Sequence, residues 1–439
     1  MKKLLVFVVY LAPVILALPN CGYTPSSGGS TSGLKYRAFI SNSVTAGALT
    51  AGVYIVDAEK DVRWQGAPIG GGNTPGMMAV TPNRNQTVVF SGNNTQFSDN
   101  VFSVINNAAE TDAGHVNLQG YTESFVISPD SQTAYVAVPN AAVVGQSPGK
   151  IQVVALISIA STGEVDIPSV HYLSLSHSGS RLLAFSDVLA TLAPQACDQT
   201  PSYLFIVTPS DIGVSSCPAV PVPGFDHPVF ATFSSDDNTA YVLNCGAECG
   251  GTQASVQVLD MTNEVAGNPV PVPAATVAFV QGATMFLAGT PYAGGVPSQP
   301  CTGQQTAATT CGVLTIFDLN QMSITATDII ITDGYHNRIA MGANGQLFIG
   351  ARTCTEILAQ PPSTEVRGCL SIYNSNTGAV VIPPANGDAT GIEPITKRTV
   401  VYVIQGGSLG IYDTATDALQ TNQIKNLIGG FVDVKVVDF

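Results

Sequence analysis

Two distant segments of the chain share one pattern, and this repeat constrains the fold more than any other feature of the sequence. FVISPDSQTAYVAV (125–138) and ATFSSDDNTAYVL (231–243) each place a polar turn between two stretches of alternating apolar residues. Alternation with a period of two indicates β-strands, and the Ser, Pro and Asp residues between them allow a tight reversal. Weaker copies of the same pattern begin at Met78, Leu173, Val277, Ile339 and Ile395.

A third apolar stretch follows each copy, and it often ends in a carboxylate or an amide. These residues are Asp57, Asp260, Asp318, Asn374 and Asp413. Because they recur at one place in the repeat, we expect them to bond the local backbone in turns rather than to act as catalytic acids. The copies follow one another at roughly 45 to 60 residues, and several short strands in a unit of that length indicate a β-propeller.

The fold class that we predict is therefore all-β, a β-propeller of eight four-stranded blades. Seven blades is the alternative if one degenerate repeat is miscounted. YRAFISN (36–42) has no first strand before it, and FVDVKVV (431–437) has no second strand after it. We expect these two segments to pair, so that the N- and C-terminal strands complete one blade and close the ring, which leaves no free sheet edge at that place.

The pattern SPDxxxAYV, from Ser128 to Val136, together with the third strand after it, resembles the YVTN-type and lactonase-like propeller repeats of bacteria. The resemblance extends over nearly all of residues 35–439. It implies a propeller domain but little about activity, since such propellers have many different functions.

The N-terminus has the pattern of an export signal. Two lysines precede an apolar run at residues 4–18, which is short for a membrane-spanning helix and contains Pro13. The run ends just before Cys21, an arrangement that resembles a bacterial lipoprotein signal peptide, in which the cysteine becomes the acylated N-terminus. We therefore predict a signal peptide at 1–20, a Gly/Ser-rich tether at 21–34 and the propeller at 35–439. The alternative is an ordinary cleaved signal with no role for Cys21.

The cysteine count supports export. The chain has nine cysteines, and without Cys21 the remaining eight are close in sequence two by two. We expect four local disulfides, which would form in an oxidising compartment, between Cys197 and Cys217, Cys245 and Cys249, Cys301 and Cys311, and Cys354 and Cys369. The protein would then be anchored to the outer membrane, in the periplasm or at the cell surface, and would contact the membrane through its lipid anchor alone.

Composition excludes several function classes. The formal net charge is −14, and no basic run follows Lys3, so we do not expect a nucleic-acid partner. The sequence has no CxxCH motif and no two CxxC pairs, which argues against covalent haem and a zinc ribbon. Trp64 is the only tryptophan, whereas quinoprotein propellers have repeated tryptophan docking motifs. We predict neither a metal nor a cofactor.

Candidate ligand-binding residues recur where the predicted inner strands begin. Loops that enter the first strand and loops between the second and third strands lie on the same face of a propeller, and this face would bear the long cysteine-containing loops. Side chains at the entries of the inner strands would face one another across the central channel. The candidates are Glu123, His171, His227, Tyr335, His336 and Arg338.

Two functions remain open. The first is a membrane-anchored binding or assembly module that uses the loop-rich, disulfide-bonded face for a protein or glycan partner at the cell envelope. The second is a lactonase-like hydrolase with its pocket at the channel mouth. We favour the first because charged residues make up only 10% of the chain and no catalytic motif, such as GxSxG, is present.

Overall fold

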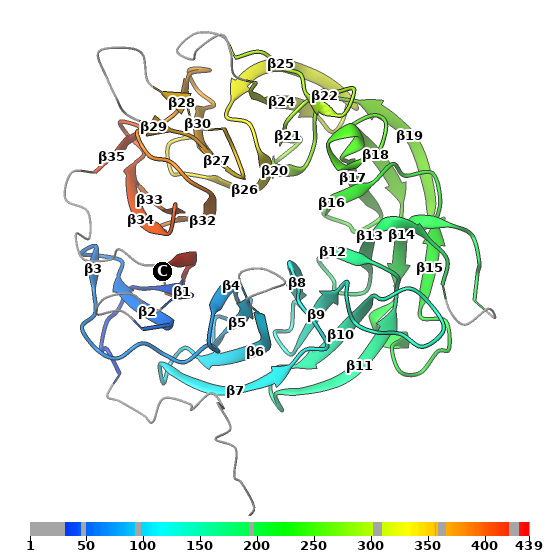
Figure 1. The fold of residues 1–439 in the computed structure, drawn as a ribbon, viewed down its shortest axis with the longest axis horizontal. Coiled ribbons are helices and arrows are strands. Elements are labelled where there is room, and N and C mark those ends of the chain that lie inside the picture. Colours follow the sequence, from blue (N-terminus) through cyan, green and yellow to red (C-terminus); the bar gives the residue numbers. More distant parts are fainter. Residues whose placement is uncertain are drawn as a thin grey trace, which may run out of the picture.

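The structure is a ring of eight sheets around a central channel (Figure 1). It is a computed structural model and describes residues 31–44, 50–92, 98–192, 197–301, 310–355, 357–358, 366–420 and 430–438. Each of the eight sheets has four antiparallel strands, which confirms the predicted all-β propeller and its blade count. The alternative of seven blades is wrong. The predicted signal peptide, Cys21 and most of the tether lie outside the described residues.

The first four blades contain these strands, from the channel outward. Blade 1 consists of β36 (Phe431–Val436), β1 (Arg37–Asn42), β2 (Gly52–Asp57) and β3 (Val62–Arg63). Blade 2 consists of β4 (Pro75–Val80), β5 (Gln86–Gly92), β6 (Ser98–Asn106) and β7 (Thr111–Asn117). Blade 3 consists of β8 (Ser124–Ile127), β9 (Thr133–Val138), β10 (Lys150–Ala155) and β11 (Ala160–Asp166). Blade 4 consists of β12 (Val170–Leu175), β13 (Leu182–Ala190), β14 (Ser202–Val207) and β15 (Ala219–Val222).

The other four blades follow the same order. Blade 5 consists of β16 (Pro228–Phe233), β17 (Thr239–Asn244), β18 (Ser255–Asp260) and β19 (Val265–Pro271). Blade 6 consists of β20 (Val277–Gln281), β21 (Thr284–Gly289), β24 (Gly312–Asp318) and β25 (Ser323–Ile331). Blade 7 consists of β26 (Tyr335–Met341), β27 (Gln346–Arg352), β30 (Leu370–Asn374) and β31 (Val380–Val381). Blade 8 consists of β32 (Ala389–Pro394), β33 (Val400–Gln405), β34 (Ser408–Asp413) and β35 (Ala418–Leu419).

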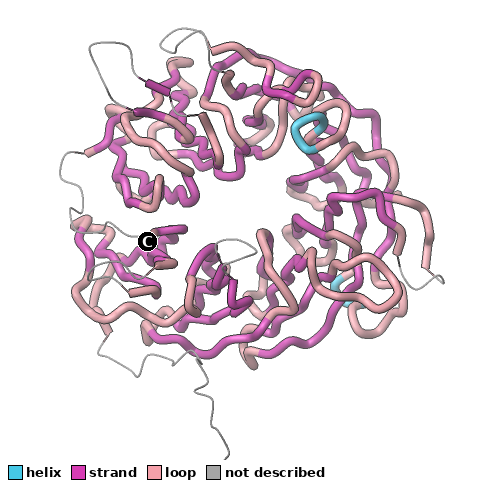
Figure 2. Tube along the Cα trace, in the orientation of Figure 1, coloured by secondary structure: helices cyan, strands magenta, loops and turns pink. Residues whose placement is uncertain are grey.

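Short elements in the loops complete the fold. Two hairpins, β22 (Tyr292–Ala293) with β23 (Val296–Pro297) and β28 (Ile357–Leu358) with β29 (Val366–Arg367), lie in the loops of blades 6 and 7. Helical structure among the described residues is limited to the 3₁₀ turns η1 (Pro209–Asp211) and η2 (Gly246–Cys249), as Figure 2 shows. Neither is long enough to cross a membrane.

The turn that defines the sequence repeat forms one hydrogen-bond network in several blades. In blade 3, the Ser128 hydroxyl donates to Asp130 at 2.5 Å and accepts from the backbone N–H of Thr133 at 2.9 Å. In blade 5, Ser234 makes the same two bonds, to Asp236 at 2.6 Å and from Thr239 at 3.0 Å. These local bonds explain why Ser and Asp recur at fixed positions of the repeat.

The Asp and Asn residues at the ends of the third strands are turn residues, as predicted. The Asp260 carboxylate accepts the backbone N–H groups of Thr262 at 2.8 Å and Asn263 at 3.0 Å. The same pair of bonds, to the residues two and three positions onward, is made by Asp57, Asp318, Asn374 and Asp413.

The hydrophobic core lies between neighbouring blades. Strand β33 is buried at every position because its sheet is packed on both faces, which explains its continuous apolar run VVYVI. Inner strands such as β12 contain partly exposed residues beside the buried ones, since they line the channel. At roughly 25 cal/mol per Å² of apolar surface removed from water, these inter-blade interfaces are the main stabilising contribution to the ring.

The two chain ends close the ring, as predicted. Strand β36 pairs with β1, with Ala38 opposite Val436 and Ile40 opposite Val434, and Figure 1 shows the C-terminal strand beside β1. The Arg37 guanidinium also binds the Asp438 carboxylate, with Nε to Oδ2 at 2.6 Å.

All four predicted disulfides are present and indicate an oxidising, exported environment. The pairs Cys245–Cys249, Cys301–Cys311 and Cys354–Cys369 lie in the connections β17–β18, β21–β24 and β27–β30. These connections join second to third strands and lie on the expected face, which we call the stapled face. Cys217 departs from this pattern, because it lies in the β14–β15 connection, which joins a third to a fourth strand, and its bond to Cys197 links that connection to the β13–β14 connection.

Candidate functional site at the channel mouth

The inner strands carry β-bulges where they begin, at the channel end of the stapled face. The register with the second strand shifts between Val170 and Tyr172 in β12, between Pro228 and Phe230 in β16, and between His336 and Arg338 in β26. The extra residues are His171, Val229 and Asn337, and all three line the channel cavity. A bulge changes the direction of a side chain, so it gives the mouth an additional residue from each of these blades.

A cavity of about 900 Å³ extends from the mouth along the inner strands. Its mouth end is lined by polar side chains, which are Glu123, His171, Tyr172, Tyr335, Asn337, Arg338, Arg352 and Thr353. Deeper positions are mainly apolar, and they include Phe125, Val126, Ile127, Leu173, Leu175, Phe230 and Val277. The cavity is within the size range of small-molecule sites in proteins.

Glu123 and His171 come together at the mouth, from blades 3 and 4. The Glu123 carboxylate lies 3.5 Å from His171 Nε2, and it accepts a hydrogen bond from the Tyr121 hydroxyl at 3.3 Å. The other imidazole nitrogen of His171, Nδ1, lies against the Asp187 carboxylate. The imidazole is therefore held between the carboxylates of Glu123 and Asp187.

Side chains from opposite parts of the ring meet across the mouth. The Tyr335 hydroxyl of blade 7 donates to the Tyr172 hydroxyl of blade 4 at 3.0 Å. Arg352 of blade 7 places Nη1 3.7 Å from Glu123 of blade 3. Burial raises the pKa of Tyr172 to about 12 and that of Tyr335 well above its usual value, so both phenols are neutral donors and acceptors near pH 7. The mouth is thus spanned by two polar contacts.

Arg338 lies below these contacts on the wall of the cavity. Its Nε donates to the Thr390 carbonyl at 2.8 Å, and its Nη1 donates to the Asn337 carbonyl at 3.0 Å. Burial lowers the pKa of the guanidinium, which still remains charged near neutral pH. Within the described ranges, no carboxylate lies within 4.0 Å of Arg338.

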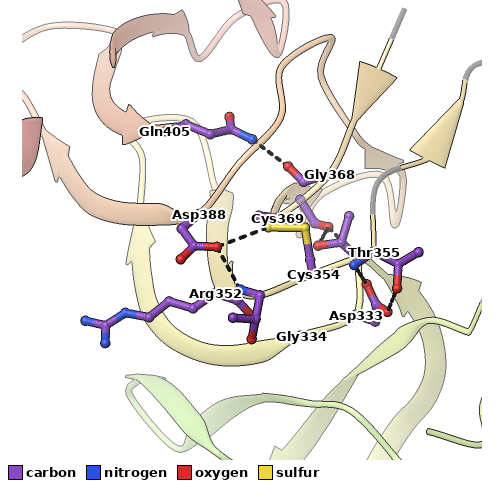
Figure 3. Close-up of a disulfide and its surroundings, with 12 residues drawn as sticks. Asp333, Gly334, Arg352, Cys354, Thr355, Gly368, Cys369, Asp388 and Gln405 are labelled. Carbon is purple, nitrogen blue, oxygen red and sulfur yellow. Dashed lines mark hydrogen bonds between the residues drawn. A yellow bond between two sulfur atoms is a disulfide. The ribbon is translucent and has the colours of Figure 1, made fainter. Parts of the chain in front are cut away.

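The loop that follows Arg352 is held on both sides of the Cys354–Cys369 disulfide (Figure 3). The backbone N–H of Thr353 donates to Asp388 at 2.7 Å, and that of Thr355 donates to Asp333 at 2.7 Å. Figure 3 shows the Arg352 side chain pointing away from the disulfide. These bonds limit the positions that the end of β27 can take, and so they orient Arg352 toward the mouth.

The two remaining candidate histidines do not line the main cavity. His227 lines a neighbouring cavity of about 250 Å³ together with Tyr172, Asp187 and Tyr335. Its ring lies 4.4 Å from that of Tyr203, and its Nδ1 lies 3.0 Å from Asp226. His336 is fully buried, and its Nε2 contacts the Thr332 carbonyl at 3.0 Å. Burial lowers the pKa of His336 to about 4. The expectation that His336 faces the channel is wrong, because the bulge at Asn337 leaves the histidine inside the blade.

Six residues of the mouth are absent from the sequence-based candidates, namely Tyr121, Tyr172, Asp187, Asn337, Arg352 and Thr353. Two of them had a signal in the sequence. Tyr172 directly follows His171, and Arg352 is the last residue of a second strand, which ends at the same face where an inner strand begins. No group of three or more His, Cys, Asp or Glu in the described part of the chain could hold a metal ion.

No family model matches the chain, and no curated protein matches it. Solved structures do resemble it. The structure of Kuenenia stuttgartiensis hydrazine synthase aligns with 78% of this chain and 96% of its own, at 12% identity and a TM-score of 0.56. Dihydro-heme d1 dehydrogenase NirN in complex with DHE aligns over 94% of this chain and 78% of its own, at 12% identity and a TM-score of 0.59. At such low identity, these similarities establish the β-propeller fold alone.

Proposed function

We propose that the protein is an envelope-anchored β-propeller that binds a protein or glycan partner through its stapled face, acting as a binding or assembly module. It would be an exported lipoprotein of the YVTN-type propellers, held in the membrane by acylation of Cys21. The anchor and the family relationship are supported by the N-terminal sequence and by the SPDxxxAYV repeat.

One observation carries this proposal: three consecutive blades have a disulfide in the same connection, on one face. Long loops on a rigid scaffold are the usual location of binding sites, and disulfides lower the entropy that such loops lose on binding. The same face exposes apolar side chains that a partner could cover, among them Val144, Val188, Leu189 and Val296.

The place where the N-terminal segment joins the propeller agrees with an orientation in which the stapled face points away from the membrane. The Ser32 hydroxyl donates to Glu110 at 2.5 Å, in the turn between β6 and β7. That turn joins a third to a fourth strand and so lies at the end opposite to the stapled face. A tether that begins there would leave the stapled face directed away from the membrane.

Two measurements on one set of variants test the proposal. Cys21→Ser should release the protein from membranes and abolish incorporation of labelled palmitate. In the anchored protein, a photo-crosslinking residue at Val296, which is 61% exposed on the stapled face, should give adducts with an envelope component. The control position is Ile157, which is 75% exposed in the β10–β11 turn at the other end. Equal adducts from both positions would contradict recognition through the stapled face, and unchanged membrane association of Cys21→Ser would contradict the anchor.

A lactonase-like hydrolase is the second candidate, favoured by the position of His171 between two carboxylates. An imidazole held in this way can act as a general base toward water. The test is the acid released from a simple γ-lactone, with His171→Gln as the variant and His177→Gln, which pairs with Asp237 outside the channel, as the control. Turnover that is lost only in His171→Gln would support the hydrolase, whereas no turnover by the unmodified protein would exclude this reaction for that substrate.

A further inference from the structure

We propose that the channel cavity is a binding site for a small anionic amphiphile, with a carboxylate at Arg338 and an apolar body against the deeper wall. This site opens on the stapled face and shares Thr353 with the β27–β30 connection, but its ligand is different in kind from a protein or glycan. The inference therefore stands even if the proposed partner does not exist.

The first observation is the position of Arg338. Two of its nitrogens donate to backbone carbonyls, of Thr390 and Asn337, which compensate only part of its positive charge. Neither bond involves Nη2, and the described residues provide no ion pair to the guanidinium. The Arg338 side chain is partly exposed on the cavity wall, so the guanidinium can be reached by a ligand there, and a carboxylate is the group whose geometry it matches best. An anion in the cavity would supply the missing charge.

The acidic side chains around Arg338 already have partners. Glu123 is shared by His171, Arg352 and the Tyr121 hydroxyl. Asp433, on β36, accepts backbone N–H groups from Met78 at 2.9 Å and Val434 at 2.8 Å, and Lys435 Nζ lies 3.3 Å away. Arg338 is therefore the side chain at the mouth whose charge is least compensated, although both carboxylates act on it at longer range.

The second observation is the apolar wall below Arg338. Phe125, Ile127, Leu175 and Phe230 come from three inner strands and line the same cavity as the guanidinium. The volume of about 900 Å³ is sufficient for a medium-length acyl chain or an aromatic ring system. A charged head at one end and apolar contacts at the other select an amphiphile, since a simple anion would leave the wall uncovered.

The two contacts across the mouth lie on the entry path. A ligand that enters from the stapled face must pass the Tyr172–Tyr335 hydrogen bond and the Glu123–Arg352 pair. The separation of 3.7 Å in the ion pair and the partial exposure of both side chains make it a weak contact that can open. The same polar groups would close over the head group after entry.

Calorimetric titration with decanoate, using decan-1-ol as the neutral comparison, tests this inference on the full exported chain. Decanoate should bind at one site and more tightly than decan-1-ol. Arg338→Gln should weaken decanoate binding by about 10- to 100-fold, which is the range expected for a charge-assisted hydrogen bond, and leave the affinity for decan-1-ol unchanged. The control is Arg181→Gln, because Arg181 lies outside the channel and bonds to Thr208.

Three results would overturn the inference. They are the absence of saturable decanoate binding, equal affinity for decanoate and decan-1-ol, and equal decanoate affinity in Arg338→Gln and in the unmodified protein. The comparison of the two ligands requires no variant, so the inference is still tested if Arg338→Gln fails to fold.

Discussion

Glu248 holds a proton in the folded protein near neutral pH. It lies in η2, inside the Cys245–Cys249 loop, and its carboxyl accepts one backbone N–H, from Thr290 at 2.9 Å. Burial raises its pKa from 4.5 to about 8. An unfolded glutamate releases its proton in that interval while the folded one keeps it, so raising the pH favours the unfolded state.

We therefore predict that the free energy of unfolding falls as the pH is raised from 5 to 8, and that Glu248→Gln removes this dependence. At pH 8 we expect the pH-dependent loss of unfolding free energy to be about 2–4 kcal/mol larger in the unmodified protein than in Glu248→Gln, after allowance for partial contact with solvent. Urea denaturation at several pH values measures it, and Glu59→Gln, at an exposed turn, is the control. Parallel pH profiles for the unmodified protein and Glu248→Gln would contradict the assignment.

For single residues at the mouth, the sequence pattern predicts which ones lie near the channel but not which way each side chain points. Glu123, His171, Tyr335 and Arg338 could be predicted to line the channel because each lies near the start of an inner strand. His336 has the same sequence position by that criterion, yet a single bulge turns it into the blade. Bulges depend on the match between two strands, which a repeat pattern alone does not reveal.

Among the connections between strands, the disulfides differ in how much of the unfolded chain they constrain. Cys354 and Cys369 are separated by 15 residues, whereas Cys245 and Cys249 are separated by 4. We predict that replacing the first pair by serines costs about 3 kcal/mol of unfolding free energy and that replacing the second costs about 2 kcal/mol, since loop entropy grows with loop length. Urea denaturation of the two double variants measures the difference. A larger loss for the shorter loop would show that local strain or packing dominates instead.

At the scale of whole elements the sequence was highly informative. Turn residues recur because each one bonds its own backbone, so Ser128 with Asp130 and Ser234 with Asp236 have the same signature. The disulfide partners could be paired because they are neighbours in sequence. The connection that contains Cys217 could not be inferred, because the repeat pattern marks the first three strands of a blade and not the fourth.

For the whole molecule, the β1–β36 pairing predicts that stability depends on the C-terminal strand. Removal of residues 430–439 deletes the inner strand of blade 1 and the Asp433 carboxylate that binds Met78 of blade 2. We expect the melting temperature to fall by about 10 °C or more, because several kcal/mol of inter-blade packing are lost. A synthetic peptide of residues 430–439 should restore much of the loss by adding the missing strand. An unchanged melting temperature would contradict a structural role for the closure.

The eight-bladed ring itself could be predicted from the repeat, but the meeting of blades 3 and 4 with blade 7 could not. Tyr172 and Tyr335 are 163 residues apart, and no sequence pattern reports the width of a channel. The side chains that span the channel can therefore be identified only from the three-dimensional structure.

Because the ring closes through β1 and β36, it can close only after all of its blades have been synthesised. Strand β1 is made among the first residues of the ring, but its partner β36 is made almost four hundred residues later, since the paired residues Ser41 and Asp433 are 392 positions apart. Until then a growing chain is an open arc with an unpaired strand edge, the kind of edge that joins other chains. A prematurely terminated product keeps that edge permanently. Completion of the ring covers this inner edge of β1, so a chaperone that recognises that edge would distinguish fragments from finished molecules.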